Sequence, residues 1–89
     1  MQGRRSLAAM NDDEIRSNID ELVSEERDLR AQHQLEPLDE ARAARLRQLE
    51  ESLDQCWDLL RQRRARREFG FDPDDVEVRD ANVVERYRQ

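Results

Sequence analysis

The sequence predicts an all-α fold: an antiparallel two-helix coiled-coil hairpin followed by an irregular C-terminal tail. Two segments each carry apolar residues at spacings of three and four, and a turn signal at Pro37 separates them. In addition, 43% of the 89 residues are charged and only two are glycine, a composition typical of surface-exposed helices. The spacing places the apolar side chains on one side of each helix, so we expect the two helices to face each other.

The first helix is expected to begin near Asn11 and to end near His33. The Asn11 side chain can accept a hydrogen bond from the backbone at Glu14, and the Glu14 carboxylate can accept one in return, which is the capping-box pattern. The helix stops before Pro37, because the residue before a proline disfavours helical dihedral angles. Its apolar stripe consists of Ile15, Ile19, Leu22 and Leu29. Glu26 occupies the one skipped position, where it either fixes the register or leans out to solvent.

The second helix is expected to begin at or just before Asp39 and to end near Phe69. Pro37 suits the turn that precedes it, and Gly70 can adopt the left-handed conformation that commonly ends a helix. Its apolar stripe alternates spacings of three and four, as the seam of a coiled coil does, and consists of Leu46, Leu49, Leu53, Cys56 and Leu60.

One antiparallel register satisfies both stripes. When a short turn joins two antiparallel helices, the residue numbers of facing pairs have a constant sum, and here that sum is 75. The facing pairs are Ile15 with Leu60, Ile19 with Cys56, Leu22 with Leu53, Glu26 with Leu49, and Leu29 with Leu46. Two stripes and a turn signal that agree in this way indicate a sequence that specifies one structure.

The apolar surface of the hairpin is wider than a two-stranded seam needs. Val23 and Trp57 flank the seam on one side, and Leu59 flanks it on the other. We therefore expect a homodimer that forms a four-helix bundle, in which the chain acts as a protein–protein interaction or scaffold module. The expected interface residues are Ile15, Ile19, Leu22, Val23, Leu53, Trp57 and Leu60. Alternatively, the C-terminal tail covers this apolar surface.

The chain divides into three parts by composition. Residues 1–10 are expected to be a disordered leader, residues 11–70 the helical hairpin, and residues 71–89 the tail. The tail lacks a clean helical or strand period, so it either packs along the hairpin or orders on binding another molecule. Our hypothesis is that it docks on the face that carries Trp57.

Nucleic-acid association is the alternative function. Five arginines lie within seven residues near the end of the second helix: Arg61, Arg63, Arg64, Arg66 and Arg67. A net charge of −6 argues against general binding to phosphates. The predicted register also brings Asp12, Asp13 and Glu14 beside this cluster, where exposed ion pairs contribute about 0 to 1 kcal/mol each. We therefore expect the cluster to be neutralised within the chain.

Catalysis and metal binding lack support in the sequence. His33 is the single histidine and lies where it can interact with a helix end, and no second nitrogen ligand accompanies it. Cys56 is the single cysteine and lies on the apolar seam, where burial raises the pKa of a thiol. We expect no enzymatic activity, no metal and no cofactor. A lone cysteine and an apolar run of only four residues, Leu7 to Met10, also favour a cytoplasmic protein that does not enter the membrane.

One stretch of the second helix resembles a known family. It reads Leu53-Asp54-Gln55-Cys56-Trp57-Asp58-Leu59-Leu60-Arg61-Gln62-Arg63-Arg64-Ala65 and is similar to the core signature of the bacterial domain of unknown function 2630 family. Supporting pieces are the start of the first helix, from Asn11 to Ile15, and Val83, Val84, Glu85 and Tyr87 near the end. The resemblance covers about residues 10 to 89, and the family often has glycine where this chain has Arg86. It implies a small bacterial helical protein and carries over no catalytic or ligand residues.

Overall fold

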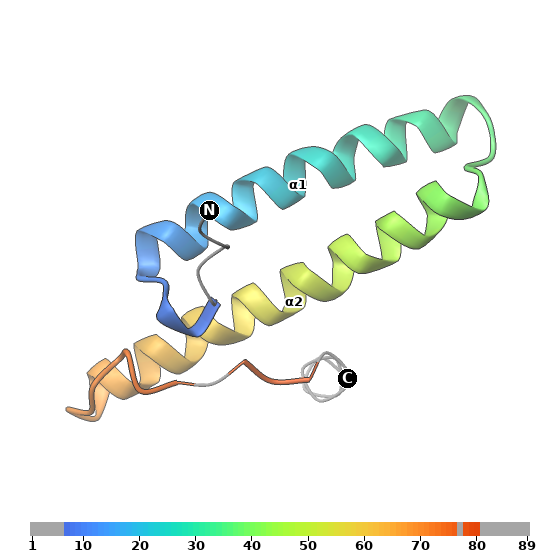
Figure 1. The fold of residues 1–89 in the computed structure, drawn as a ribbon. Helices are drawn as coiled ribbons and strands as arrows, with labels where there is room; N and C mark the ends of the chain where they lie inside the picture. Colours follow the sequence, from blue (N-terminus) through green and yellow to red (C-terminus); the bar gives the residue numbers. More distant parts are fainter. Residues whose placement is uncertain (1–6, 77, 81–89) are drawn as a thin grey trace, which may run out of the picture.

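The structure, a computed structural model, describes residues 7–76 and 78–80, and the regular secondary structure of this part is helical. A short 3₁₀ helix, η1 (Leu7–Ala9), precedes two long helices, α1 (Asp12–Leu35) and α2 (Glu40–Glu68). The two long helices run antiparallel and are joined by a short turn (Figure 1). The predicted all-α hairpin is confirmed.

The start of α1 has the predicted capping box. The backbone N–H of Glu14 donates to Asn11 Oδ1 at 2.9 Å, and the backbone N–H of Asn11 donates to Glu14 Oε1 at 3.1 Å. These bonds satisfy two of the backbone donors that every helix start leaves open. The helix continues to Leu35, two residues beyond the predicted end. Its last turn closes when the backbone N–H of Glu36 donates to the carbonyl of Gln32, directly before Pro37.

Both ends of α2 also follow the sequence signals. The Asp39 carboxylate caps the start by accepting from the backbone N–H of Arg42 at 2.8 Å. At the other end Gly70 has a φ of 78°, and its N–H donates to the Arg67 carbonyl at 3.2 Å. The N–H of Phe71 donates to the Arg66 carbonyl at 2.7 Å, which completes a Schellman motif.

The core of the hairpin lies between the helices toward their free ends. It consists of Ile15, Ile19, Leu53, Cys56, Leu59 and Leu60. Ile15 and Leu60 belong to this one cluster, as do Ile19 and Cys56, which agrees with the predicted register. Leu59, which the sequence places on one flank of the seam, is fully buried.

Segments outside the hairpin explain why Leu59 is buried. Leu7 of η1, Met10 directly after it and Val76 of the tail pack against the core cluster. Residues 7–10 thus contact the core, while residues 1–6 lie outside the described part. The division of the chain into three parts stays a prediction.

The described part of the tail runs back along α2 (Figure 1). Arg63 donates to the Pro73 carbonyl at 3.2 Å, and Gln55 Nε2 donates to the Arg79 carbonyl at 3.2 Å. These contacts, with Val76 on the core, place residues 73–76, 78 and 79 on the side of α2 that carries Gln55 and not on the groove that Trp57 lines. The expected contact of Val83, Val84 and Tyr87 with the Trp57 face lies outside the described residues.

We predict that Gly70→Ala lowers the free energy of unfolding by about 1 kcal/mol, because an L-residue is strained at positive φ. A Cβ atom at this position meets nothing within 4 Å, so the backbone alone carries the cost. Urea unfolding followed by circular dichroism measures the change. Gly70→Asn is the matched control and should cost less, because asparagine tolerates the left-handed region. Unchanged stability in Gly70→Ala would contradict the cap.

Candidate functional site

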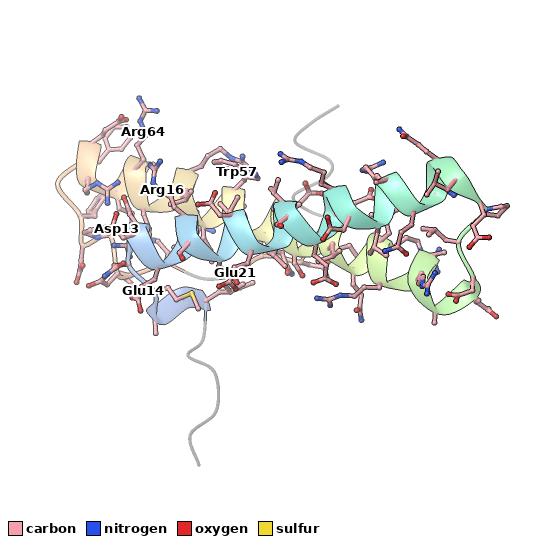
Figure 2. All side chains as sticks on the ribbon, turned by 90° about the horizontal axis from the view of Figure 1, so that it is seen from above. Asp13, Glu14, Arg16, Glu21, Trp57 and Arg64 are labelled. Atoms are coloured by element: carbon pink, nitrogen blue, oxygen red, sulfur yellow. The ribbon has the colours of Figure 1, made fainter. Side chains whose placement is uncertain are left out.

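A groove lies beside Trp57 on one face of the hairpin. The Trp57 side chain is 42% exposed although it is large and apolar, and Val23 and Leu53 line the groove with it. The remaining lining residues are charged: Glu26, Arg30, Glu50 and Asp54. We call this surface the Trp57 groove. Figure 2 shows that Trp57 lies on the face of the hairpin opposite η1.

Helix geometry explains why Trp57 reaches the surface. Successive residues of an α-helix are 100° apart, so Trp57 points well away from its neighbour Cys56, which is fully buried on the seam. Val23 lies one turn after Ile19 on α1 and flanks the same side of the seam. Both residues line one groove, as the sequence predicts for residues on a common flank.

Carboxylates dominate the rim of the Trp57 groove. Arg30 lies 3.3 Å from Glu26 and 3.6 Å from Glu50, so one guanidinium pairs with two carboxylates, and Asp54 adds a third acidic group that is 6% exposed. Glu26, whose side chain is 21% exposed, pairs with Arg30 on its own helix, so whether it fixes the register or leans out to solvent stays a prediction. The groove combines an apolar floor with a predominantly acidic rim.

The seven predicted interface residues divide into two groups. Four of them, Ile15, Ile19, Leu53 and Leu60, are at most 8% exposed and pack within the core of the chain itself. Leu22 is half-buried and lines a hollow on the opposite face with Leu7 and Met10. Val23 and Trp57 are the members best placed to meet another molecule. Assignment of all seven residues to a homodimer interface stays a prediction.

Each arginine of the predicted nucleic-acid cluster has an acidic partner in the chain. The pairs are Arg61 with Asp58 at 3.8 Å, Arg63 with Asp12 and with Asp74 at 2.8 Å, Arg64 with Glu68 at 3.0 Å, Arg66 with Asp75 at 3.7 Å, and Arg67 with Asp12 at 2.8 Å. The expected neutralisation of the cluster by carboxylates is therefore present among the described residues. These carboxylates lower the net positive charge that the cluster presents to a phosphate.

Arg63 differs most from its predicted role, because its side chain is only 6% exposed. It donates to Asp12 at the start of α1, and to the Pro73 carbonyl and Asp74 in the tail. One guanidinium thus joins three segments. The signal was present in the sequence, since Arg63 follows Leu60 by three residues and so continues the seam to the position that faces Asp12.

Asp12 accepts from two arginines. Hydrogen bonds from Arg67 and Arg63 hold the pKa of the Asp12 carboxyl below its ordinary value, and they outweigh the opposing effect of partial burial. The carboxylate also lies in the first turn of α1, where negative charge is favourable near the helix dipole. Asp12 and Arg63 together fasten the free end of the hairpin.

Asp58 is a buried charged residue that the sequence analysis did not single out. It is 2% exposed and accepts from Gln62 Nε2 at 2.8 Å, while Arg79 of the tail lies 3.5 Å away. Its burial therefore accompanies a contact between α2 and the tail. No helical or strand period in the tail indicated which face of α2 it covers.

The single cysteine lies in the core, and the single histidine lies near the turn. Cys56 is fully buried; desolvation raises the pKa of its thiol, and Asn18 Nδ2 donates to its sulfur at 3.4 Å. His33 lies in the last turn of α1, as expected for a histidine beside a helix end, and lines a shallow hollow near the turn. Within residues 7–76 and 78–80, no three His, Cys, Asp or Glu side chains form a group able to hold a metal ion.

Neither long helix has the length and apolar character needed to cross a membrane, judged over the part of the chain that the structure describes.

Comparisons with known proteins point to one family. The sequence profile of the family described as "Protein of unknown function (DUF2630)" matches residues 11–89. Uncharacterized proteins of Mycobacterium bovis (strain AF2122/97) and of Mycobacterium tuberculosis (strains CDC 1551 and H37Rv) are each 49% identical to the chain over 77 residues. The match covers 85% of this chain and 88% of each relative. No solved structure matches the chain with significance.

We predict that Asp12→Asn lowers the free energy of unfolding by about 2 kcal/mol at neutral pH, because it removes charge-assisted hydrogen bonds to Arg63 and Arg67. The pKa of Asp12 is lowered in the folded state, so its contribution is complete above the unfolded value of about 4 and is lost as the pH falls through the folded value. Urea titrations from pH 7 to pH 2 should therefore show that the variant approaches wild-type stability at acid pH.

Asp13→Asn, one residue further along α1, is the matched control and should leave the difference between neutral and acid pH nearly unchanged. Equal acid sensitivity of wild type and Asp12→Asn would contradict the role of the Asp12 pairs.

Proposed function

The chain belongs to the DUF2630 family, and from its geometry we propose that it is a non-catalytic protein–protein interaction module that self-associates through the Trp57 groove. Two hairpins packed in this way form a four-helix bundle. The observation that carries the proposal is the exposure of Trp57 at 42% beside Val23 and Leu53.

The single-layer architecture supports self-association. Stable domains usually consist of at least two packed layers of secondary structure, because a helix buries only the side that faces another element. In Figure 1, α1 and α2 form one layer. On one face Leu7 and Met10 pack against the core, whereas the Trp57 groove lies on the opposite face (Figure 2). A second copy supplies the missing layer.

The chemistry of the groove suits a protein contact. Tryptophan is enriched among the residues that dominate binding energy at protein interfaces, where a large side chain is surrounded by a polar rim. Trp57 has this setting, with carboxylates and Arg30 around an apolar floor. Burial of the exposed part of Trp57 is the main gain expected from association.

Absence of catalysis and a cytoplasmic location are part of the proposal. Cys56 is fully buried with a raised thiol pKa, which suits a packing role and not a nucleophile. A lone buried thiol is compatible with a reducing compartment. Nucleic-acid association through Arg61 to Arg67 stays the alternative, and the acidic partners of these arginines disfavour it.

We predict that the full chain doubles its mass with rising concentration, measured by size-exclusion chromatography with light scattering, and that Trp57→Ala weakens the dimer at least about 30-fold. The expected loss corresponds to removal of a residue that contributes 2 kcal/mol or more at an interface. Circular dichroism of the variant establishes that the helices remain.

Phe71→Ala is the matched control, because Phe71 is an aromatic residue that is 63% exposed away from the groove. It should leave the dimer intact. A wild-type monomer at every concentration would refute self-association, and a Trp57→Ala dimer of wild-type affinity would place the interface elsewhere.

A further inference from the structure

The charges on the exposed flank of α2 are arranged symmetrically about Trp57. Glu50 lies seven residues before Trp57 and Arg64 lies seven residues after it. Seven residues make almost two helical turns, so all three side chains lie along one flank, with each charge about 10 Å from Trp57 along the axis. Glu50 and Arg64 are both accessible, with side-chain exposures of 48% and 78%.

We propose that the second copy packs antiparallel on the Trp57 groove, with a two-fold axis at Trp57, so that Glu50 of each copy meets the partner's Arg64. This inference rests on the proposed self-association and adds its geometry. A two-fold axis makes an interface self-complementary, since every contact occurs twice. The arrangement brings the two Trp57 side chains together at the centre and places ion pairs on both sides of them.

The same axis pairs opposite charges on α1. The register of the hairpin places Asn18 of α1 at the same height along the helix axes as Trp57 of α2. Arg16 lies two residues before Asn18, and Asp20 lies two residues after it. A two-fold axis at this level therefore brings Arg16 opposite the partner's Asp20. Arg16 and Asp20 are exposed, and Figure 2 shows Arg16 on the same face as Trp57 and Arg64. Two helices thus show complementary charge about one axis.

The ion pairs that Arg64 and Glu50 make within one chain do not prevent new ion pairs between the two copies. Arg64 lies 3.0 Å from Glu68, and Glu50 lies 3.6 Å from Arg30, but all four side chains are more than 45% exposed. Exposed pairs of this kind contribute little and re-form easily with new partners. Ion pairs between the copies orient the association more than they strengthen it, and salt weakens them.

Charge reversal tests the axis. Arg64→Glu alone and Glu50→Arg alone should each weaken the dimer about tenfold, because each change creates two like-charge contacts related by the axis. The double variant should recover affinity to within about threefold of wild type, because each reversed residue then meets a reversed partner. Analytical ultracentrifugation at 50 mM and 500 mM salt measures the dissociation constants, and the differences should shrink at high salt.

Arg42→Glu is the control, since it makes the same charge change in the first turn of α2, where the axis places no facing residue of the partner's α2. It should leave the dissociation constant unchanged. If both single variants weaken the dimer and the double variant does not recover, the antiparallel axis is wrong. If no charge variant has an effect while Trp57→Ala still dissociates the dimer, the axis is wrong and self-association through the groove stands. A wild-type chain that stays monomeric would refute both the axis and self-association through the groove.

Discussion

The rest of the structure depends on the register between the two helices. Ile15 packs with Leu60, and Ile19 with Cys56, only in an antiparallel alignment whose midpoint is the turn at Pro37. That alignment also brings Asp12 to Arg63, so the apolar and the ionic contacts support the same pairing. A slip of one helical turn would separate both sets at once, which explains how so short a chain specifies one hairpin.

The register determines what each side of the hairpin exposes. Two helices in one layer bury only the sides that face each other, and the flanks need other cover. The chain covers one flank itself, where Leu7, Met10 and Val76 pack against the core and bury Leu59. On the other flank the Trp57 groove remains exposed, and we propose that a second copy of the chain packs on it.

Much of the fold was predictable from local sequence signals. Asn11 and Glu14 predicted the start of α1, and Gly70 the end of α2, because capping depends on residues within one turn of each other. The flank that carries Trp57 followed from helical periodicity alone. The burial of Leu59, Arg63 and Asp58 was not foreseen, because the tail and the leader, which contact this region, have no periodic pattern that shows where they pack.

The measurement that most directly tests the account is the fluorescence of Trp57 over a concentration series. The chain contains one tryptophan, so its emission reports on the groove alone. The account predicts that, over the range in which the mass doubles, the emission moves to shorter wavelength and quenching by acrylamide decreases, because the indole leaves water. A doubling of the mass with unchanged emission and quenching would contradict it, since the second copy would then lie on another face.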